Sequence, residues 1–165
     1  MSKLKFGWSE VSITPDQSIS LAGQFFERIS EYVETPVTVT AMAVECGGEQ
    51  MIICSADLCV VSIALLNDIR QYLRKNYPQV PAEKVLVHAT HSHTSHVYDR
   101  GSEVGCAELD ILLRFMPEDM ISKPLSSSSD VMTPAEARVY LTEKIAQAAA
   151  EAWDNMKPAV YACGF

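Results

Sequence analysis

The chain has 165 residues, of which 48% are hydrophobic and 21% charged, a composition typical of a globular protein with one core. Its net charge of −8 argues against a nucleic-acid partner or an anionic membrane surface, since no basic stripe can neutralise phosphates. The first ten residues contain no apolar export signal, and no apolar run is long enough to form a transmembrane segment. With five scattered cysteines and no CxxC pair, these features predict a cytoplasmic chain with reduced thiols.

The N-terminal third predicts strands joined by turns. Residues 6–15 alternate apolar and polar side chains up to a proline, as in a half-buried strand. Gly23 follows and is expected at a turn or at a close approach between segments. Residues 37–46 form a β-branched run, and Gly47-Gly48 predicts a hairpin turn into residues 50–57. This last run is almost wholly apolar, which predicts a strand covered on both faces.

A strand, a helix and a second strand then predict a βαβ unit. Residues 62–77 carry apolar side chains at helical spacing, and Pro78 and Pro81 end the helix. Residues 84–90 form the next apolar strand, which should lie parallel to the strand at residues 50–57. The expected fold class is therefore α/β, with a mixed sheet, a βαβ unit and flanking helices.

The C-terminal half predicts an insert, a long helix and a last strand within a single domain of residues 1–165. Residues 97–132 lack periodicity and are expected to be an irregular insert or a lid. A capping box with Pro134 at the first helical position begins at Thr133 and predicts a helix to about Met156. Residues 159–165 read as a further strand that nothing covers. We therefore expect part of a larger catalytic domain and possible self-association through that strand.

All four histidines lie within nine positions, from His88 to His96, where a parallel strand is expected to end. Open α/β sheets bind their ligands at this edge. In extended backbone His91 and His93 point to the same side, and neutral imidazole is the commonest protein ligand for zinc. His91 and His93 are therefore both candidates for a metal-binding or catalytic role. His88, of opposite parity, is expected to support the ligands from behind or to join the core, and the role of His96 stays open.

Three other residues are candidates for supporting or substrate-binding roles. Asp57 ends a buried strand at the same edge, where its carboxylate could orient a histidine or cap the helix that begins near Ser62. Arg28 could bind a substrate anion or form a surface ion pair. Gly23 is a further candidate for such a role.

Two families share features with the histidine segment. The sequence THSHTSH (residues 90–96) resembles the T-H-x-H-x-D-H loop of metallo-β-lactamase-fold hydrolases, which binds two zinc ions. Ser95 stands where that family has an aspartate ligand.

The broader resemblance is to the N-terminal part of the neutral/alkaline non-lysosomal ceramidase family. Four motifs carry it in order and at matching spacing: VSITP (residues 11–15), LAGQ (residues 21–24), SAD (residues 55–57) and ATHSH (residues 89–93). ATHSH resembles the A-T-H-T-H motif of the family, although Thr94-Ser95-His96 replaces the S-G-P that follows there.

The ceramidase resemblance implies a zinc-dependent hydrolase that cleaves the amide of N-acyl-sphingosine or of another N-acyl, lipid-like small molecule. It implies that His91 is a zinc ligand and that His93 lies beside the metal and faces the substrate. In the family the remaining zinc ligands are a histidine, a glutamate and a tyrosine that come later in the sequence. They are not identifiable in this chain. The alternatives are a metallo-β-lactamase-like hydrolase and a truncated, non-catalytic module that depends on a partner.

Overall fold

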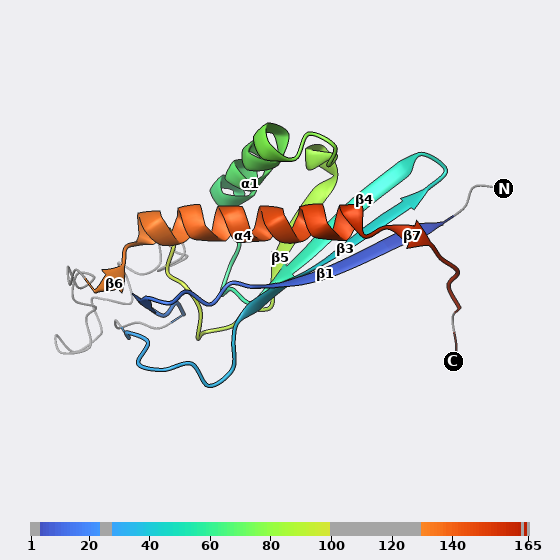
Figure 1. Cartoon of the computed structure of the whole chain (residues 1–165). Coiled ribbons are helices and arrows are strands. Elements are labelled where there is room, and N and C mark those ends of the chain that lie inside the picture. The colour runs from blue at the N-terminus through green and yellow to red at the C-terminus, as the bar shows by residue number, and fades with distance from the viewer. Residues whose placement is uncertain (1–3, 24–27, 100–129, 163, 165) are drawn as a thin grey trace, which may run out of the picture.

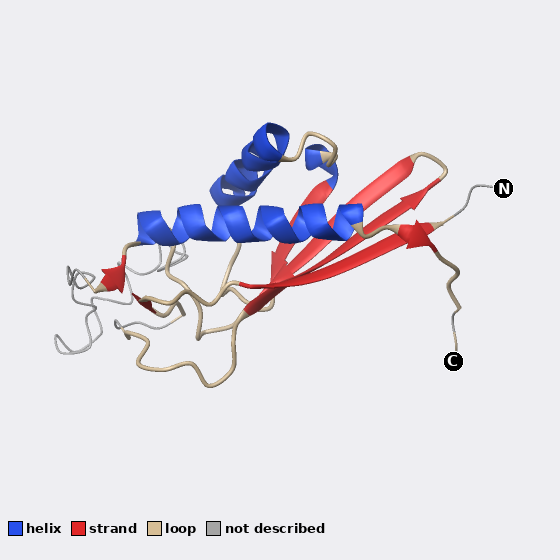
Figure 2. Cartoon of the chain, viewed as in Figure 1, coloured by secondary structure: helices blue, strands red, loops and turns tan. Residues whose placement is uncertain are grey.

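A computed structural model describes residues 4–23, 28–99, 130–162 and 164. Figure 1 shows two helices packed on one face of a twisted sheet, and Figure 2 shows the same view by secondary structure. The α/β class with a mixed sheet is therefore confirmed. The expected insert or lid at residues 97–132 lies mostly outside the described residues.

The main sheet has five strands in the order β5-β4-β3-β1-β7. Strands β4 and β5 are parallel, as the βαβ prediction requires, and the other neighbours are antiparallel. The turn at Gly47 and Gly48 joins β3 to β4, and both glycines have positive φ, of 64° and 89°. The strands are β1 (Lys5–Ser12), β3 (Thr38–Cys46), β4 (Glu49–Ala56), β5 (Val85–Ala89) and β7 (Lys157–Pro158). A separate parallel pair joins β2 (Ser18–Ile19) to β6 (Val131–Met132).

Both predicted helices form, each with a side-chain N-cap. Helix α1 (Ile63–Asn76) begins after Ser62, whose Oγ accepts a hydrogen bond from the backbone N–H of Leu65. It leads to β5 through the single 3₁₀ turn η1 (Ala82–Lys84). Helix α4 (Pro134–Asp154) has the predicted capping box at its first turn. None of the described helices combines the length and apolarity needed to cross a membrane.

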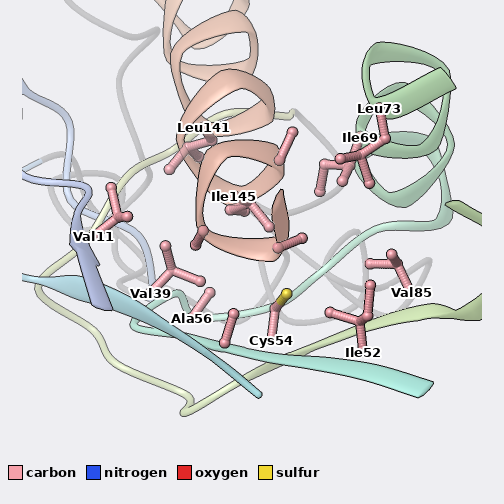
Figure 3. Close-up of a cluster of buried hydrophobic side chains, with 14 of the residues drawn as sticks. Val11, Val39, Ile52, Cys54, Ala56, Ile69, Leu73, Val85, Leu141 and Ile145 are labelled. Atoms are coloured by element: carbon pink, nitrogen blue, oxygen red, sulfur yellow. The ribbon is translucent and has the colours of Figure 1, made fainter. Parts of the chain in front are cut away.

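The core lies between the helices and one face of the sheet (Figure 3). Helix α4 buries many alanines, so its backbone comes close to β1. The Ser9 hydroxyl donates to the Ala148 carbonyl at 2.7 Å, and a Cβ added to Gly7 would lie 1.9 Å from the Ala152 carbonyl oxygen. The larger core side chains come from the sheet (Val39, Ile52, Val85), from α1 (Leu65, Ile69, Leu73) and from α4 (Leu141, Ile145).

The opposite face of the sheet carries no helix in the described part of the chain (Figure 2). Several of its large apolar side chains are exposed: Trp8 by 54%, Leu86 by 51%, Met51 by 40% and Phe6 by 38%. The prediction that β4 is covered on both faces is therefore wrong for the described structure. The even alternation of buried and exposed side chains in β1 is typical of a sheet with one packed face.

The last strand differs from the prediction. Pairing with β1 occurs at Lys157–Pro158, and residues 159–162 form no strand. Pro158 has no N–H to donate, and after it only the Ala159 N–H continues the pairing, with the Leu4 carbonyl at 2.9 Å. Self-association through this edge stays a prediction.

Candidate metal centre

The site lies at the carboxyl edge of the parallel pair β4 and β5. Past the end of β5 the two segments stay hydrogen-bonded, through the Thr90 N–H to the carbonyl of Ala56, the last residue of β4, at 2.9 Å and the Ser92 N–H to the Leu58 carbonyl at 3.1 Å. The segment after β4 therefore runs beside the histidine segment. This places Cys59 next to His91, although 32 residues separate them in the sequence.

His91 is held by its backbone and by its ring. Its φ of 66° is positive, which among the described residues is shared only with glycines. Such strain is typical of functional positions that their surroundings hold in place. The ring Nδ1 lies 2.7 Å from the Cys59 carbonyl oxygen. Because a carbonyl can only accept, Nδ1 carries the proton and Nε2 presents its lone pair, the arrangement that protein-bound metals commonly use.

His93 faces His91 across the site. The two Nε2 atoms lie 3.4 Å apart, and the rings meet edge to face with centroids 4.9 Å apart. The sequence analysis expected the two rings to converge through extended backbone, but the left-handed turn at His91 brings them together instead. Both side chains are exposed, so a metal ion or a substrate could reach them from solvent.

The position of His93 is fixed by Gly23 and Arg28. Gly23 has a φ of 85°, and a Cβ at this position would lie 2.5 Å from ring atoms of His93. The close approach expected at Gly23 is therefore present. Arg28 is half-buried, and its Nη2 donates to the His93 carbonyl oxygen at 2.6 Å. This hydrogen bond holds the loop that carries His93. Among the described residues, Arg28 forms neither the surface ion pair nor the anion contact that the sequence suggested.

A hollow of about 790 Å³ begins beside this loop. Arg28 and Thr94 line its wall on the histidine side, and residues 14–19 and 29–35 form most of the remainder. The lining mixes apolar side chains such as Ile19 with polar and acidic ones. Its volume is enough to admit part of a small organic molecule beside Arg28 and Thr94.

Asp57 and His88 differ from their predicted roles. The Asp57 carboxylate accepts hydrogen bonds from the Thr38 N–H at 2.9 Å and from the Thr90 hydroxyl at 3.0 Å. The helix-cap interpretation is wrong, because Ser62 caps α1. Its contact with Thr90 instead steadies the residue that precedes the histidine pair. The core interpretation of His88 is also wrong: the side chain is exposed, because Val85 and Ala89 take the helix side of β5.

His96 is a buried side chain rather than a solvent-facing member of the cluster. It is 1% exposed, its ring stacks on Tyr140 with centroids 6.0 Å apart, and Nδ1 lies 3.2 Å from the Ser95 hydroxyl. Nε2 has no hydrogen-bond partner among the described residues. Burial lowers the pKa of His96 to about 4, so the ring is neutral at physiological pH.

This burial predicts a loss of stability in mild acid. Below pH 6.5 the unfolded chain protonates His96 and the folded chain does not, so the free energy of unfolding falls as pH drops from about 6.5 to about 4. The difference between these pKa values corresponds to about 3 kcal/mol. In urea titrations of metal-free protein, His96→Phe, which keeps the aromatic stack, is expected to lose this part of the pH dependence. His88→Phe is the exposed control, and an unchanged slope in His96→Phe would contradict the assignment.

Cys59 was not found by the sequence analysis. Its side chain is 8% exposed, packs with Ala22 and Val97, and places Sγ 4.0 Å from His91 Nδ1. Cys59, His91 and His93 each offer one candidate ligand atom, and these three atoms lie within 4.8 Å of one another. Burial raises the pKa of the Cys59 thiol above its ordinary value.

The histidine pair fits a zinc ion. Two imidazole ligands of a tetrahedral zinc, with Zn–N bonds of about 2.0–2.1 Å, have nitrogens about 3.3 Å apart. The Nε2 atoms of His91 and His93 are 3.4 Å apart. His91 Nδ1 is already engaged by a backbone carbonyl, as ligating histidines commonly are. The residues present could therefore hold zinc without rearrangement of the pair.

Comparison with known proteins relates the fold to one class of enzyme. No protein-family model and no curated protein matches the chain. Among solved structures, a crystal structure of neutral ceramidase from Pseudomonas aeruginosa matches with a TM-score of 0.68 and 16% sequence identity. A structure of ceramidase complexed with C2 matches with a TM-score of 0.67 and 17% identity. Each match covers 96% of this chain and 22% of the ceramidase chain. The fold is therefore ceramidase-like, and the chain spans about a fifth of the length of these neighbours.

Proposed function

We propose that this chain is part of a zinc-dependent hydrolase of ceramidase type, which cleaves the amide bond of an N-acyl-sphingosine or of another N-acyl, lipid-like substrate. The observation that carries the proposal is the pair of facing Nε2 atoms of His91 and His93, 3.4 Å apart at the edge of a ceramidase-like sheet. Because the chain spans 22% of each ceramidase neighbour, the substrate and the whole activity belong to the proposal.

The proposed roles follow from the positions of the side chains. In such a site zinc supplies Lewis-acid polarisation of a carbonyl and a lowered pKa for water. His91 binds the metal through Nε2, and the Cys59 carbonyl orients the ring through Nδ1. His93, whose Nε2 faces the same point, holds or moves a proton at the amide when substrate is bound. Arg28 keeps His93 in place through its carbonyl and borders the hollow that would take part of the substrate.

A cytoplasmic location is part of the same proposal. The cysteines within the described ranges, Cys46, Cys54 and Cys59, are free thiols, which supports the cytoplasmic location expected from the sequence.

Hydrolysis of a short-chain, fluorogenic N-acyl-sphingosine by the chain at saturating zinc tests the proposal. Wild type is expected to release the fatty acid, and His93→Ala is expected to lower kcat at least about 100-fold, the usual contribution of a positioned acid or base. His88→Ala, on the exposed side of β5, should leave kcat unchanged. Zinc binding without hydrolysis by wild type would contradict catalysis by this chain and favour the non-catalytic, partner-dependent module.

A further inference from the structure

The carboxyl edge of the sheet brings a thiol to the histidine pair. Cys59 follows β4, His91 and His93 follow β5, and the backbone hydrogen bond from Ser92 to Leu58 keeps the two segments together. Candidate ligand atoms of the three side chains lie within 4.8 Å of one another. We propose that Cys59 is a metal ligand and that this chain by itself forms a Cys-His-His zinc site. The inference rests on the proposed function for the metal and for the role of His91.

The thiol needs only a small displacement to reach a shared metal. Zinc bonds of about 2.3 Å to sulfur and about 2.0–2.1 Å to nitrogen place the two ligand atoms about 3.6 Å apart. The candidate ligand atoms of the three side chains are at most 4.8 Å apart. A displacement of the Cys59 side chain by about 1 Å therefore suffices. The backbone can stay in place, because the Cys59 carbonyl already binds the ring of His91.

The surroundings of Cys59 favour ligation over a purely packing role. Ala22 and Val97 cover it with small apolar side chains, and the recorded polar contact of Sγ is with His91 Nδ1. A thiolate there makes the site softer than a histidine–carboxylate set and favours zinc over magnesium or calcium. Three protein ligands leave the fourth position of a tetrahedral ion open, as catalytic zinc sites do.

The site proposed here assigns His93 a second role. While the chain alone holds zinc, Nε2 of His93 serves as the third ligand. With substrate bound, the same nitrogen would leave the metal and be free to exchange a proton with the amide. Cys59 and His93 would thus keep the metal in place in the resting chain.

Cobalt binding to the whole 165-residue chain tests the thiolate directly. Cobalt(II) replaces zinc in tetrahedral sites, and a thiolate ligand gives an intense near-ultraviolet charge-transfer band. Wild type is expected to show this band. Cys59→Ser is expected to lose the band and to bind zinc at least about 10-fold more weakly. Cys46→Ser, which removes an exposed thiol, is expected to keep the band and the zinc affinity. Circular dichroism melts establish that Cys59→Ser is folded.

A second measurement needs no variant. Saturating zinc is expected to slow alkylation of Cys59 but not of Cys46, read by peptide mass spectrometry. Cobalt binding that depends on His91 but gives no thiolate band, with no protection of Cys59, would overturn the inference and leave the proposed histidine site standing. Failure of wild type to bind cobalt or zinc at all would instead overturn the proposed function together with this inference.

Discussion

Replacing His91 with alanine is expected to remove stoichiometric zinc from the purified chain. The affinity should fall at least about 100-fold, because even residues that only orient a ligand contribute 10- to 100-fold to metal affinity. His91 offers a free Nε2, a ring fixed through Nδ1 and a backbone held at a φ of 66°. Zinc content after dialysis, measured by inductively coupled plasma mass spectrometry, and competition with a chromogenic chelator give the result.

The matched control for His91→Ala is His88→Ala. His88 lies three residues earlier in the chain and is exposed, and the hydrogen bond of its ring among the described residues is to the Ala89 carbonyl at 3.5 Å. This variant should keep the zinc content and affinity of wild type. Equal zinc loss in both variants would show that the metal binds nonspecifically to the histidine-rich segment, and unchanged binding in His91→Ala would refute His91 as a ligand.

Much of the fold was predictable because local signals and the tertiary structure agree. The glycine pair at residues 47–48 specifies the hairpin turn, the alternation in β1 marks one buried face, and the capping box at Thr133 marks the start of α4. The coverage of the sheet was not predictable from β4 alone. A run of apolar residues is compatible with one packed face or with two, and Met51 is in fact 40% exposed.

The candidate site was only half predictable. The histidine spacing pointed to His91 and His93, but the rings converge through a left-handed turn at His91. That turn could not be predicted, because no glycine stands beside His91 in the sequence. Cys59 belongs to no sequence motif, and it reaches the histidines only through the pairing of β4 with β5. One retrievable signal was present: residues that follow neighbouring parallel strands meet at one edge, so a thiol three residues after Ala56 was a candidate.

Replacing Gly23 with alanine is expected to displace His93 and to weaken zinc binding about 10-fold or more, while the chain stays folded. The new Cβ would lie 2.5 Å from the His93 ring, closer than unbonded carbon atoms approach, so the ring must move. The φ of 85° adds a backbone cost of about 1–2 kcal/mol for any residue other than glycine. Isothermal titration with zinc and urea unfolding measure the two effects separately.

Gly48→Ala separates the backbone cost from the clash. Gly48 has a nearly equal φ of 89° in the hairpin turn, and a Cβ there meets no atom within 4 Å. This variant should lose comparable stability and keep the zinc affinity of wild type. In a His93→Ala background the ring is absent, so Gly23→Ala should cost no more stability than Gly48→Ala does. Undiminished zinc affinity in Gly23→Ala would mean that His93 does not need its observed position to hold the metal.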